Sequence, residues 1–487
     1  MNAQFLLLLA LVAPPAAAVA LSLLPRPPGL RDVLHIGGAL TAAIATLLIA
    51  QMAAENQGGR LVLGRPLPGV DLALAIEPLG ALTAALIAGL GVLHAIHTAG
   101  VVRATDEPQP ARMMAFIAIA SAAAIAAALS ANLFTFFVAY QTLILATFPL
   151  VAHGGDPDAR AAARIYLATF LTASMGLLLP AMVWTYALAG PADFQPGGVL
   201  AGRVTPLAAN ILLALFSLGI AACAIPPVQG WLSASSRAPH PALVSIQAIA
   251  VLPVGGIGLL KVVAYVFGAA MHDAAIVSRA LVLITGVGMC AAALIALSKQ
   301  DFRGRLAYSC MAQALAVAMG ALLTHPTGLV AAALQIVALT FGAATLMMAA
   351  GTVFAATGRT QVGDYAGLGR VMPWTFAAFA LGSASMIGMP PFSGAWAKLW
   401  LITAADDAGL VWAAALAGAA AILTFAHLGP LAASALAARA PTDAFKRPDG
   451  ASIMLVAPII LSAAATLWLL IVADPLARFL SPLWSGR

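Results

Sequence analysis

Apolar stretches of helix length, separated by short polar loops, follow one another along almost the whole chain. They cover approximately residues 1–24, 33–53, 78–101, 111–129, 132–152, 162–189, 207–225, 243–268, 280–298, 306–324, 328–356, 372–390, 392–437 (interrupted) and 451–472. An α-helix needs about 20 apolar residues to cross the hydrocarbon core of a bilayer. The pattern therefore predicts an all-α polytopic membrane protein with about fourteen transmembrane helices.

The first stretch could also be a secretory signal. Such a signal begins with basic residues and has a shorter apolar run. Here the chain begins without basic residues, and the apolar run continues to Leu24 before it meets Pro25 and Arg26. We therefore expect a retained first transmembrane helix.

Basic residues lie mainly in alternate loops. The odd-numbered loops hold Arg26, Arg31, Arg103, Arg112, Arg160, Arg164, Arg237, Lys299, Arg303, Arg305, Arg359, Arg370, Arg439, Lys446 and Arg447, whereas the even-numbered loops hold only Arg60, Arg65, Arg203 and Arg279. Short cytoplasmic loops carry the excess of lysine and arginine. The odd-numbered loops are thus predicted to be cytoplasmic, with both termini on the non-cytoplasmic side.

Composition supports the membrane assignment. Of 487 residues, 62% are hydrophobic and only 8% are charged, which leaves too little polar surface for a soluble protein. The net charge of +6 comes from the loops, so no nucleic-acid partner is expected. The cysteines Cys223, Cys290 and Cys310 lack ligand spacing, and His94 and His97 share a helix face without a third ligand. Neither a disulfide framework nor a metal or iron–sulfur site is predicted.

Helix-breaking residues interrupt two apolar runs. Pro226 and Pro227 precede Gly230, and Pro390 and Pro391 precede Gly394, at corresponding places in the two halves. Paired broken helices indicate an inverted repeat with a polar path between its halves. Proline kinks that only pack would produce the same pattern.

Three segments carry a family resemblance: residues 139–153, 226–232 and 388–398. They resemble the antiporter-like membrane subunits of respiratory complex I and of Mrp-type multisubunit sodium/proton antiporters, with the D-type Mrp subunit the nearest in appearance. The basic turn and helix at 297–313 also look like the family pattern. The resemblance covers roughly residues 70–440.

The resemblance implies two inverted five-helix repeats, each with a broken helix. It divides the chain into N-terminal helices 1–3 (1–110), a first repeat of helices 4–8 (111–268), a second repeat of helices 9–13 (280–437) and a C-terminal helix with its tail (451–487).

The family comparison locates the ion path and shows what this chain lacks there. Ionisable groups in hydrocarbon are costly, few and normally functional, yet all seventeen carboxylates of this chain fall in predicted loops or near helix ends. The family's glutamate of helix 5 corresponds to Gln141, and its lysine of helix 7 corresponds to Ala222. Its helix 8 histidine and lysine correspond to Gln247 and Pro253, and a lysine of the second half corresponds to Ala343. The resemblance implies that the family's glutamate, lysines and histidine form the proton relay. Because this chain has Gln141, Ala222, Gln247, Pro253 and Ala343 in their places, the relay is predicted to be degenerate here.

Some ionisable groups remain. Lys261, late in helix 8, is expected either to snorkel or to face a polar axis. Lys398 matches a family lysine and is a candidate to line a polar cavity, and His427 is either the terminal relay or a structural histidine. Glu77 is expected to cap the helix that it precedes.

Three functional hypotheses follow. The first is a structural scaffold within a multisubunit ion-transport or respiratory complex, with other membrane subunits and the lipid bilayer as its partners. The second is an active proton- or cation-translocating subunit that uses Lys398 and His427. The third is a membrane subunit of an inorganic-carbon uptake complex.

The chain itself is not expected to be an enzyme, although it could be a non-redox subunit of a larger oxidoreductase. No cofactor is predicted, because neither a cysteine cluster nor a glycine-rich dinucleotide motif is present. The predicted location is a bacterial-type inner, energy-transducing membrane.

Overall fold

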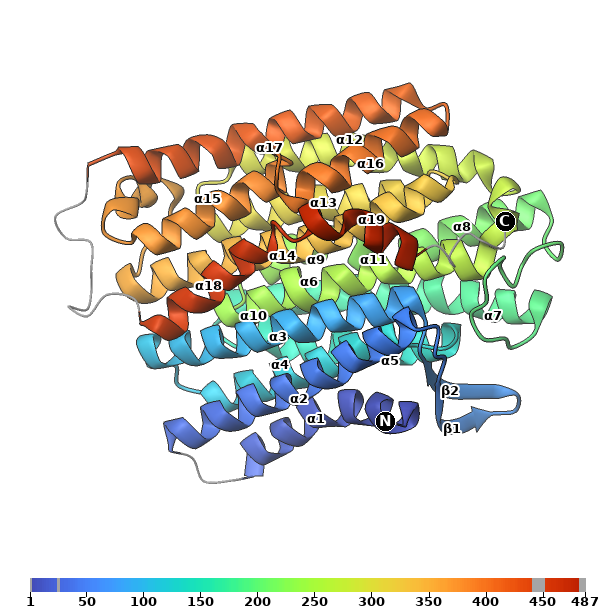
Figure 1. Ribbon diagram of the computed structural model, residues 1–487, viewed down its shortest axis with the longest axis horizontal. Helices are drawn as coiled ribbons and strands as arrows, with labels where there is room; N and C mark the ends of the chain where they lie inside the picture. Colours follow the sequence, from blue (N-terminus) through green and yellow to red (C-terminus); the bar gives the residue numbers. More distant parts are fainter. Residues whose placement is uncertain (1, 24–26, 440–451, 481–487) are drawn as a thin grey trace.

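The computed structural model describes residues 2–23, 27–439 and 452–480, and its long helices lie side by side in one bundle (Figure 1). The chain begins with helices α1, α2 and α3, with a short antiparallel hairpin between the last two. These elements are α1 (Ala3–Leu23), α2 (Pro28–Ala54), β1 (Arg60–Leu67), β2 (Val70–Ala75) and α3 (Pro78–Thr105). The hairpin was not predicted. Its two-residue turn is Pro68–Gly69, and Gly69 has φ +75°, a conformation that glycine adopts without strain.

The remaining helices divide into two sets. The first consists of α4 (Pro110–Ala128), α5 (Leu133–Val151), α6 (Pro157–Ala173), α7 (Leu179–Ala189), α8 (Pro206–Gly219), α9 (Gly230–Ser235), α10 (His240–Val244) and α11 (Val251–Lys261). The second consists of α12 (Ala275–Ser298), α13 (Phe302–Leu322), α14 (Pro326–Thr357), α15 (Pro373–Ile387), α16 (Ser393–Asp407) and α17 (Val411–Ala437), followed by α18 (Ile453–Ala465) and α19 (Leu469–Phe479).

Wider π-helical turns join some of these helices into single spans. The turn η1 (Ser174–Leu178) links α6 to α7, and η3 (Ser245–Ala250) and η4 (Val262–Phe267) extend α11 at its two ends. The span that contains α11 runs from His240 to His272, and its most apolar part is completely buried inside the bundle. It is the central helix of the first set.

Both predicted helix breaks are confirmed. Helix α8 ends at Gly219, the short turn η2 (Ala221–Cys223) follows, and the chain re-enters a helix at Gly230. Helix α15 ends at Ile387, and α16 begins at Ser393. A Cβ atom on Gly394 would overlap the carbonyl oxygen of Ser385, so the second break requires glycine there.

The number of spans differs from the prediction of about fourteen. In the described part of the chain, eleven helices are long and apolar enough to cross a membrane, or twelve if α18 and α19, bent by 62°, count as one span. The broken helices account for part of the difference, because α8, α15 and α16 have only 14, 15 and 15 residues. Each piece alone is too short to cross the hydrocarbon.

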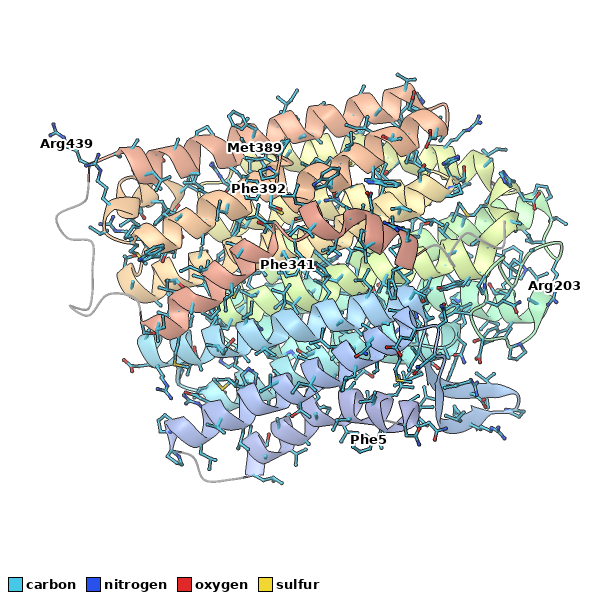
Figure 2. All side chains as sticks on the ribbon, in the orientation of Figure 1. Phe5, Arg203, Phe341, Met389, Phe392 and Arg439 are labelled. Carbon is cyan, nitrogen blue, oxygen red and sulfur yellow. The ribbon has the colours of Figure 1, made fainter. Side chains whose placement is uncertain are left out.

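Contacts between loops confirm that successive helices run in alternate directions. His153 pairs with Glu107 at 3.0 Å, which joins the loops after α5 and α3. Arg60 pairs with Asp193 at 2.8 Å, which joins the loops after α2 and α7. We call the end that holds His153 the odd-loop face and the end that holds Asp193 the even-loop face. Arg439 and Arg203 mark these opposite ends in Figure 2.

This alternation gives the two sets of helices opposite orientations. Helix α4 begins at the odd-loop face, because it follows the loop that holds Glu107. Helix α12 begins at the even-loop face, since Asn210 at the start of α8 donates to the carbonyl of Asp273, just before α12. The inverted arrangement expected from the paired breaks is therefore present.

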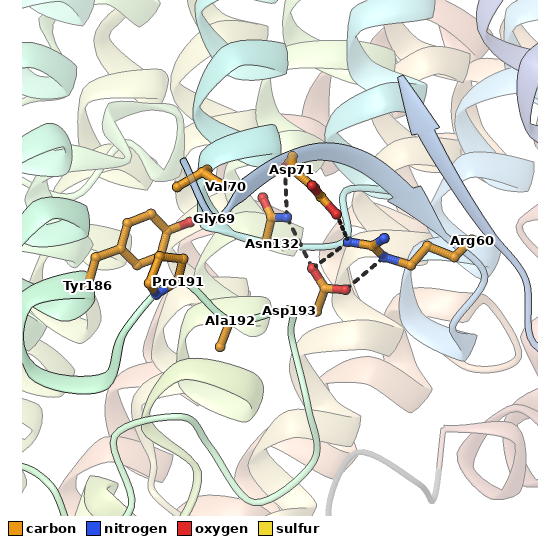
Figure 3. A pocket seen from close by; sticks show the side chains of 9 residues that line it. All are labelled: Arg60, Gly69, Val70, Asp71, Asn132, Tyr186, Pro191, Ala192 and Asp193. Carbon is orange, nitrogen blue, oxygen red and sulfur yellow. Dashed lines mark hydrogen bonds and ion pairs between the residues drawn. The ribbon is translucent and has the colours of Figure 1, made fainter. Parts of the chain in front are cut away.

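A polar cluster on the even-loop face holds the hairpin to the bundle (Figure 3). The Arg60 guanidinium donates to the carboxylates of Asp71 and Asp193, at 2.8 Å in each case. Asn132, which caps α5, donates to the Asp193 carboxylate at 3.1 Å and to the Asp71 carbonyl at 3.0 Å. These groups line a polar pocket of about 200 Å³. The hydrogen bond from Arg60 lowers the pKa of the Asp71 carboxyl, and both carboxylates raise the pKa of Arg60.

We predict that Arg60→Gln releases the hairpin. Amide hydrogen exchange of residues 60–75 should become several-fold faster at neutral pH, because the shared cation is lost. Arg65→Gln is the matched control, since Arg65 is mostly exposed and pairs with Asp71 alone among the described residues. Because the folded-state pKa of Asp71 is depressed, its stabilising effect is present at neutral pH and is lost as the pH falls below about 4. Acid should therefore release the hairpin of the parent protein, and equal exchange in the Arg60 variant and the parent at pH 7 would contradict the assignment.

Candidate functional site: the buried polar residues of the two repeats

Tyr140 connects α5 to the first helix break. Its side chain is fully buried, and its hydroxyl accepts a hydrogen bond from the backbone N–H of Ala222 at 3.1 Å. The ring stacks on Phe136, with ring centroids 5.8 Å apart. The contact brings the chain next to Gln141 against Ala222, two positions of the ion path predicted from the sequence. A neutral hydroxyl–amide hydrogen bond occupies this junction.

Gln141 has one hydrogen-bonded atom and one that is unsatisfied. Its Oε1 accepts from the Ser174 hydroxyl at 3.3 Å, where η1 begins. Its Nε2 is buried and has no partner among the described residues. An amide in this position can hold a water molecule but cannot change its charge.

Gln247 and Pro253 lie within the central span. Gln247 is fully buried and donates from Nε2 to the Ser235 hydroxyl at 2.7 Å and to the Leu232 carbonyl at 3.1 Å. Pro253 lacks a backbone N–H, and its ring clashes with the carbonyl four residues earlier in a regular α-helix. The π turn η3 immediately precedes it and accommodates this disruption.

Lys261 lies at the even-loop end of the central span, in a buried ion pair. Its Nζ is 3.3 Å from Glu77 Oε1 and donates to the carbonyl of Ser130 at 2.8 Å. The ammonium also lies over the ring of Phe194, 5.2 Å from its centroid. Lys261 is completely buried and so does not snorkel to water.

The Glu77 carboxylate is fully engaged. It caps α3 as expected, accepting from the backbone N–H groups of Leu79 at 2.9 Å and Gly80 at 2.6 Å. Its Oε2 also accepts from the Tyr265 hydroxyl at 2.6 Å. With Lys261, four donors hold this carboxylate in place, which suits a clamp between α3 and the central span.

Lys398 lies beside the second break, in the second repeat. Its Nζ donates to the Met386 carbonyl at 2.7 Å and to Gln313 Oε1 at 3.2 Å. Gln335 donates to the same Gln313 oxygen at 2.9 Å, so three helices share one hydrogen-bonded chain. Throughout the described ranges, no carboxylate lies within ion-pair distance of Lys398.

A cavity of about 480 Å³ adjoins this chain. Lys398 lines it together with Pro391 at the break, Gly418 of α17 and Leu470 of α19. Its other walls are mainly apolar side chains. Lys398 thus borders a cavity, but this cavity is chiefly hydrophobic, whereas the sequence made Lys398 a candidate to line a polar one.

His427 and Ala343 lie apart from Lys398. His427, on α17, is buried and bonds through Nδ1 to the Leu423 carbonyl at 3.0 Å, while its own carbonyl accepts from Arg305 at 3.4 Å. Ala343 is buried in α14. Within the described residues, neither a hydrogen bond nor an ion pair joins Lys398 to His427.

Several buried polar residues were not predicted from the sequence, notably Tyr140, Gln313, Gln335, His35 and His240. They are neither carboxylates nor family ion-path positions, which were the two signals used to predict the site. Amides and histidines inside apolar runs are a third signal that could have found most of them, because any polar side chain in hydrocarbon needs a partner.

Comparison with known proteins agrees with this architecture. Residues 130–424 match the family described as NADH:quinone oxidoreductase/Mrp antiporter, transmembrane. The chain belongs to this family. The resemblance stated from the sequence is confirmed.

Curated relatives come from both branches of the family. NADH-quinone oxidoreductase subunit N of Desulforudis audaxviator is 27% identical over 385 residues, covering 77% of this chain and 75% of that protein. The D-type subunit of the Na⁺/H⁺ antiporter of Alkalihalophilus pseudofirmus is 24% identical over 279 residues, covering 57% of this chain and 56% of that protein. The chain thus spans three quarters of the first relative and little more than half of the second.

The fold also occurs in a solved structure of an Mrp complex from a Dietzia species. A chain of that complex superposes with a TM-score of 0.86 at 22% identity, covering 99% of this chain and 97% of that chain. This protein is therefore a multi-pass membrane protein with the fold of antiporter-like subunits.

We predict that Glu77→Gln destabilises the fold. The change leaves the buried Lys261 ammonium without its carboxylate, which should lower the free energy of unfolding by about 3 kcal/mol. The double variant Glu77→Gln/Lys261→Met should lose less than the sum of the two single changes, because they remove one shared interaction. Denaturant unfolding of the purified protein in detergent measures this coupling.

Glu55→Gln is the matched control, since Glu55 is exposed and its carboxylate accepts from the amides of Gln51 and Gln57 on the same face. Additive effects of the Glu77 and Lys261 changes would show that the pair is not a clamp.

Proposed function

We propose that this chain is an antiporter-like scaffold subunit of a hetero-oligomeric membrane complex, in which other subunits carry the ions. The observation that supports the proposal is the neutral set Gln141, Ala222, Gln247, Pro253 and Ala343, at positions where the family resemblance implies titrating residues. Gln247, Ala222, Pro253 and Ala343 are buried.

Proton transfer through hydrocarbon requires groups that accept and release protons, or a continuous file of water. The junction between α5 and the first break instead holds the hydrogen bond between Tyr140 and Ala222. The amides of Gln141 and Gln247 are held by Ser174 and Ser235. The resemblance implies that the family's glutamate and lysine at the positions of Gln141 and Ala222 form an ion pair. The neutral Gln141 and Ala222 cannot form such a pair.

The partners in this proposal are membrane subunits that retain the ionisable residues, together with lipid. Any electron transfer belongs to partner subunits, so the chain is a non-redox and non-catalytic member. The excess of basic residues in odd-numbered loops supports a cytoplasmic odd-loop face. Both termini then lie on the opposite side of an energy-transducing bacterial-type membrane.

The alternative, an active second repeat, has one observation in its favour. The chain Lys398–Gln313–Gln335 is hydrogen-bonded, contains one ionisable group and adjoins the 480 Å³ cavity. Lys398 could release a proton to water that entered the cavity. Lys398 also donates a hydrogen bond to the Met386 carbonyl, which gives it a structural role at the break.

We predict that proton or cation flux survives the loss of Lys398 and His427. In vesicles that contain the whole native complex, Lys398→Met and His427→Gln, alone and combined, should each keep at least about half of the parent proton or cation flux. Lys299→Met, at the odd-loop face, is the matched lysine control. A flux reduced about tenfold in an intact complex would reject the scaffold assignment and support the active second repeat.

We also expect the chain to be purified with companions. After extraction of the tagged protein from its native membrane in mild detergent, mass spectrometry should find stoichiometric antiporter-like subunits with intact glutamate and lysine residues. If the folded chain were isolated without stoichiometric companions, the scaffold function would be contradicted.

A further inference from the structure

The second helix break places Lys398 near the middle of the bundle's length. Helices α15 and α16, on the two sides of the break, have 15 residues each. At 1.5 Å per residue each helix is about 22 Å long, so the break lies deep in the hydrocarbon. Met389 and Phe392, at the break, accordingly lie between Arg439 and Arg203, which mark the two ends of the bundle (Figure 2).

The amino group of Lys398 has two hydrogen-bond acceptors and no anionic partner in the described part of the chain. Its Nζ donates to the Met386 carbonyl and to Gln313 Oε1, and the residue is 8% exposed. A lone ammonium in hydrocarbon is costly, so the amine is expected to be uncharged whenever no anion is bound. Its two N–H groups then make the two hydrogen bonds, and its lone pair is left to accept a proton.

The cavity of about 480 Å³ beside Lys398 is large enough for a ligand, since small-molecule sites measure about 300–1,000 Å³. The amine lies against one of its walls: a Cβ atom added to Gly388 would be 3.3 Å from Lys398 Nζ. The wall formed by α17 consists of the small residues Ala417, Gly418 and Ala421. A Cβ atom on Gly418 would meet no atom within 4 Å, so this wall leaves open space.

The cavity opens on the flank of the bundle, between α16 and α19. Leu399 and Leu470, which line it, are 55% and 48% exposed. Helix α19 bends by 62° from α18 and contacts α16 (Figure 1). The backbone N–H of Ser393 donates to the Thr466 carbonyl at 2.7 Å, which ties this bend to the second break. A lipid-soluble molecule can therefore enter from the bilayer without crossing either loop face.

We propose that this cavity binds a long-chain fatty acid, with the carboxyl group at Lys398 Nζ and the alkyl chain along the apolar walls of α17 and α19. The acid enters uncharged. Its O–H bond breaks, and the proton forms a new N–H bond at the lone pair of Nζ, which leaves a carboxylate beside an ammonium. The pair has no net charge, so no unpaired charge enters the hydrocarbon.

The depth of Lys398 favours a fatty acid over a phospholipid. The phosphate of a phospholipid lies at the headgroup level, about 15 Å from the middle of a hydrocarbon core about 30 Å thick. A single-chain acid can reach the middle because it is neutral while it crosses. This inference does not rest on the scaffold function proposed above.

The test is photo-crosslinking of the whole native complex in phosphatidylcholine nanodiscs. Palmitic acid with a diazirine at the end of its chain should label α16, α17 or α19 on irradiation. Unlabelled palmitic acid should compete at least about tenfold better than hexadecanol, which has the same chain without the carboxyl group, because charge-assisted hydrogen bonds are the stronger ones. In Lys398→Met this preference for the acid should disappear.

A second variant tests the cavity without a change to the lysine. Gly418→Leu should lower the labelling at least about fivefold, because its side chain fills space that the alkyl chain needs. Gly89→Leu, on α3, is the matched control, since a Cβ atom there also meets no atom within 4 Å and Gly89 lies outside this cavity. Its labelling should equal that of the parent.

Three results would overturn the proposal. They are equal labelling of Gly418→Leu and the parent, equal competition by hexadecanol and palmitic acid in the parent, and a preference for the acid that survives in Lys398→Met. Competition by added phosphatidylglycerol as strong as that by palmitic acid would instead assign the cavity to a phospholipid and reject the fatty acid. If Lys398→Met fails to assemble, Gly418→Leu and the comparison of acid with alcohol in the parent still decide.

Discussion

The structure depends on the need of every buried backbone polar group for a partner in a solvent that supplies none. Regular helices satisfy this need internally, but the two breaks release carbonyl and amide groups inside the bundle. At the first break, Trp231 and Tyr140 bind the released groups of Ala221 and Ala222. At the second, Lys398 binds the Met386 carbonyl. The side chains of Tyr140, Trp231 and Lys398 thus hold the broken helices together.

A neutral contact holds the first break, and a lysine holds the second. Tyr140 satisfies the Ala222 amide without a charge, so the first break needs neither a glutamate nor a lysine. Lys398 donates to both the Met386 carbonyl and Gln313, which gives it a structural role at the second break. A shared fold at 22% identity is compatible with this view, because packing and satisfied backbone groups maintain the architecture.

Among the described residues, most charge lies at the two ends of the bundle and in a few ion pairs. On the even-loop face, Arg60 joins the hairpin to the loop after α7, and Lys261 with Glu77 joins α3 to the central span. Near the odd-loop face, the Asp32 carboxylate forms ion pairs with Arg31 and Arg103, one helical turn from His35. Between these layers most buried polar groups are neutral hydroxyls, amides and imidazoles. Such groups can guide water or protons, but they do not hold a permanent charge in hydrocarbon.

The sequence by itself determined the membrane class, the position of most spans, their alternating direction and both helix breaks, because apolar length, basic loops and proline–glycine pairs are local signals. It also identified the cap at Glu77 and the family. The predicted count of about fourteen spans is not confirmed, since a broken helix counts as apolar sequence but not as one continuous segment. Only the tertiary structure decided the pairing of Glu77 with Lys261, the chain from Lys398 to Gln335 and the contact of Ser393 with Thr466. These contacts join residues far apart in sequence, and their geometry depends on how the helices pack.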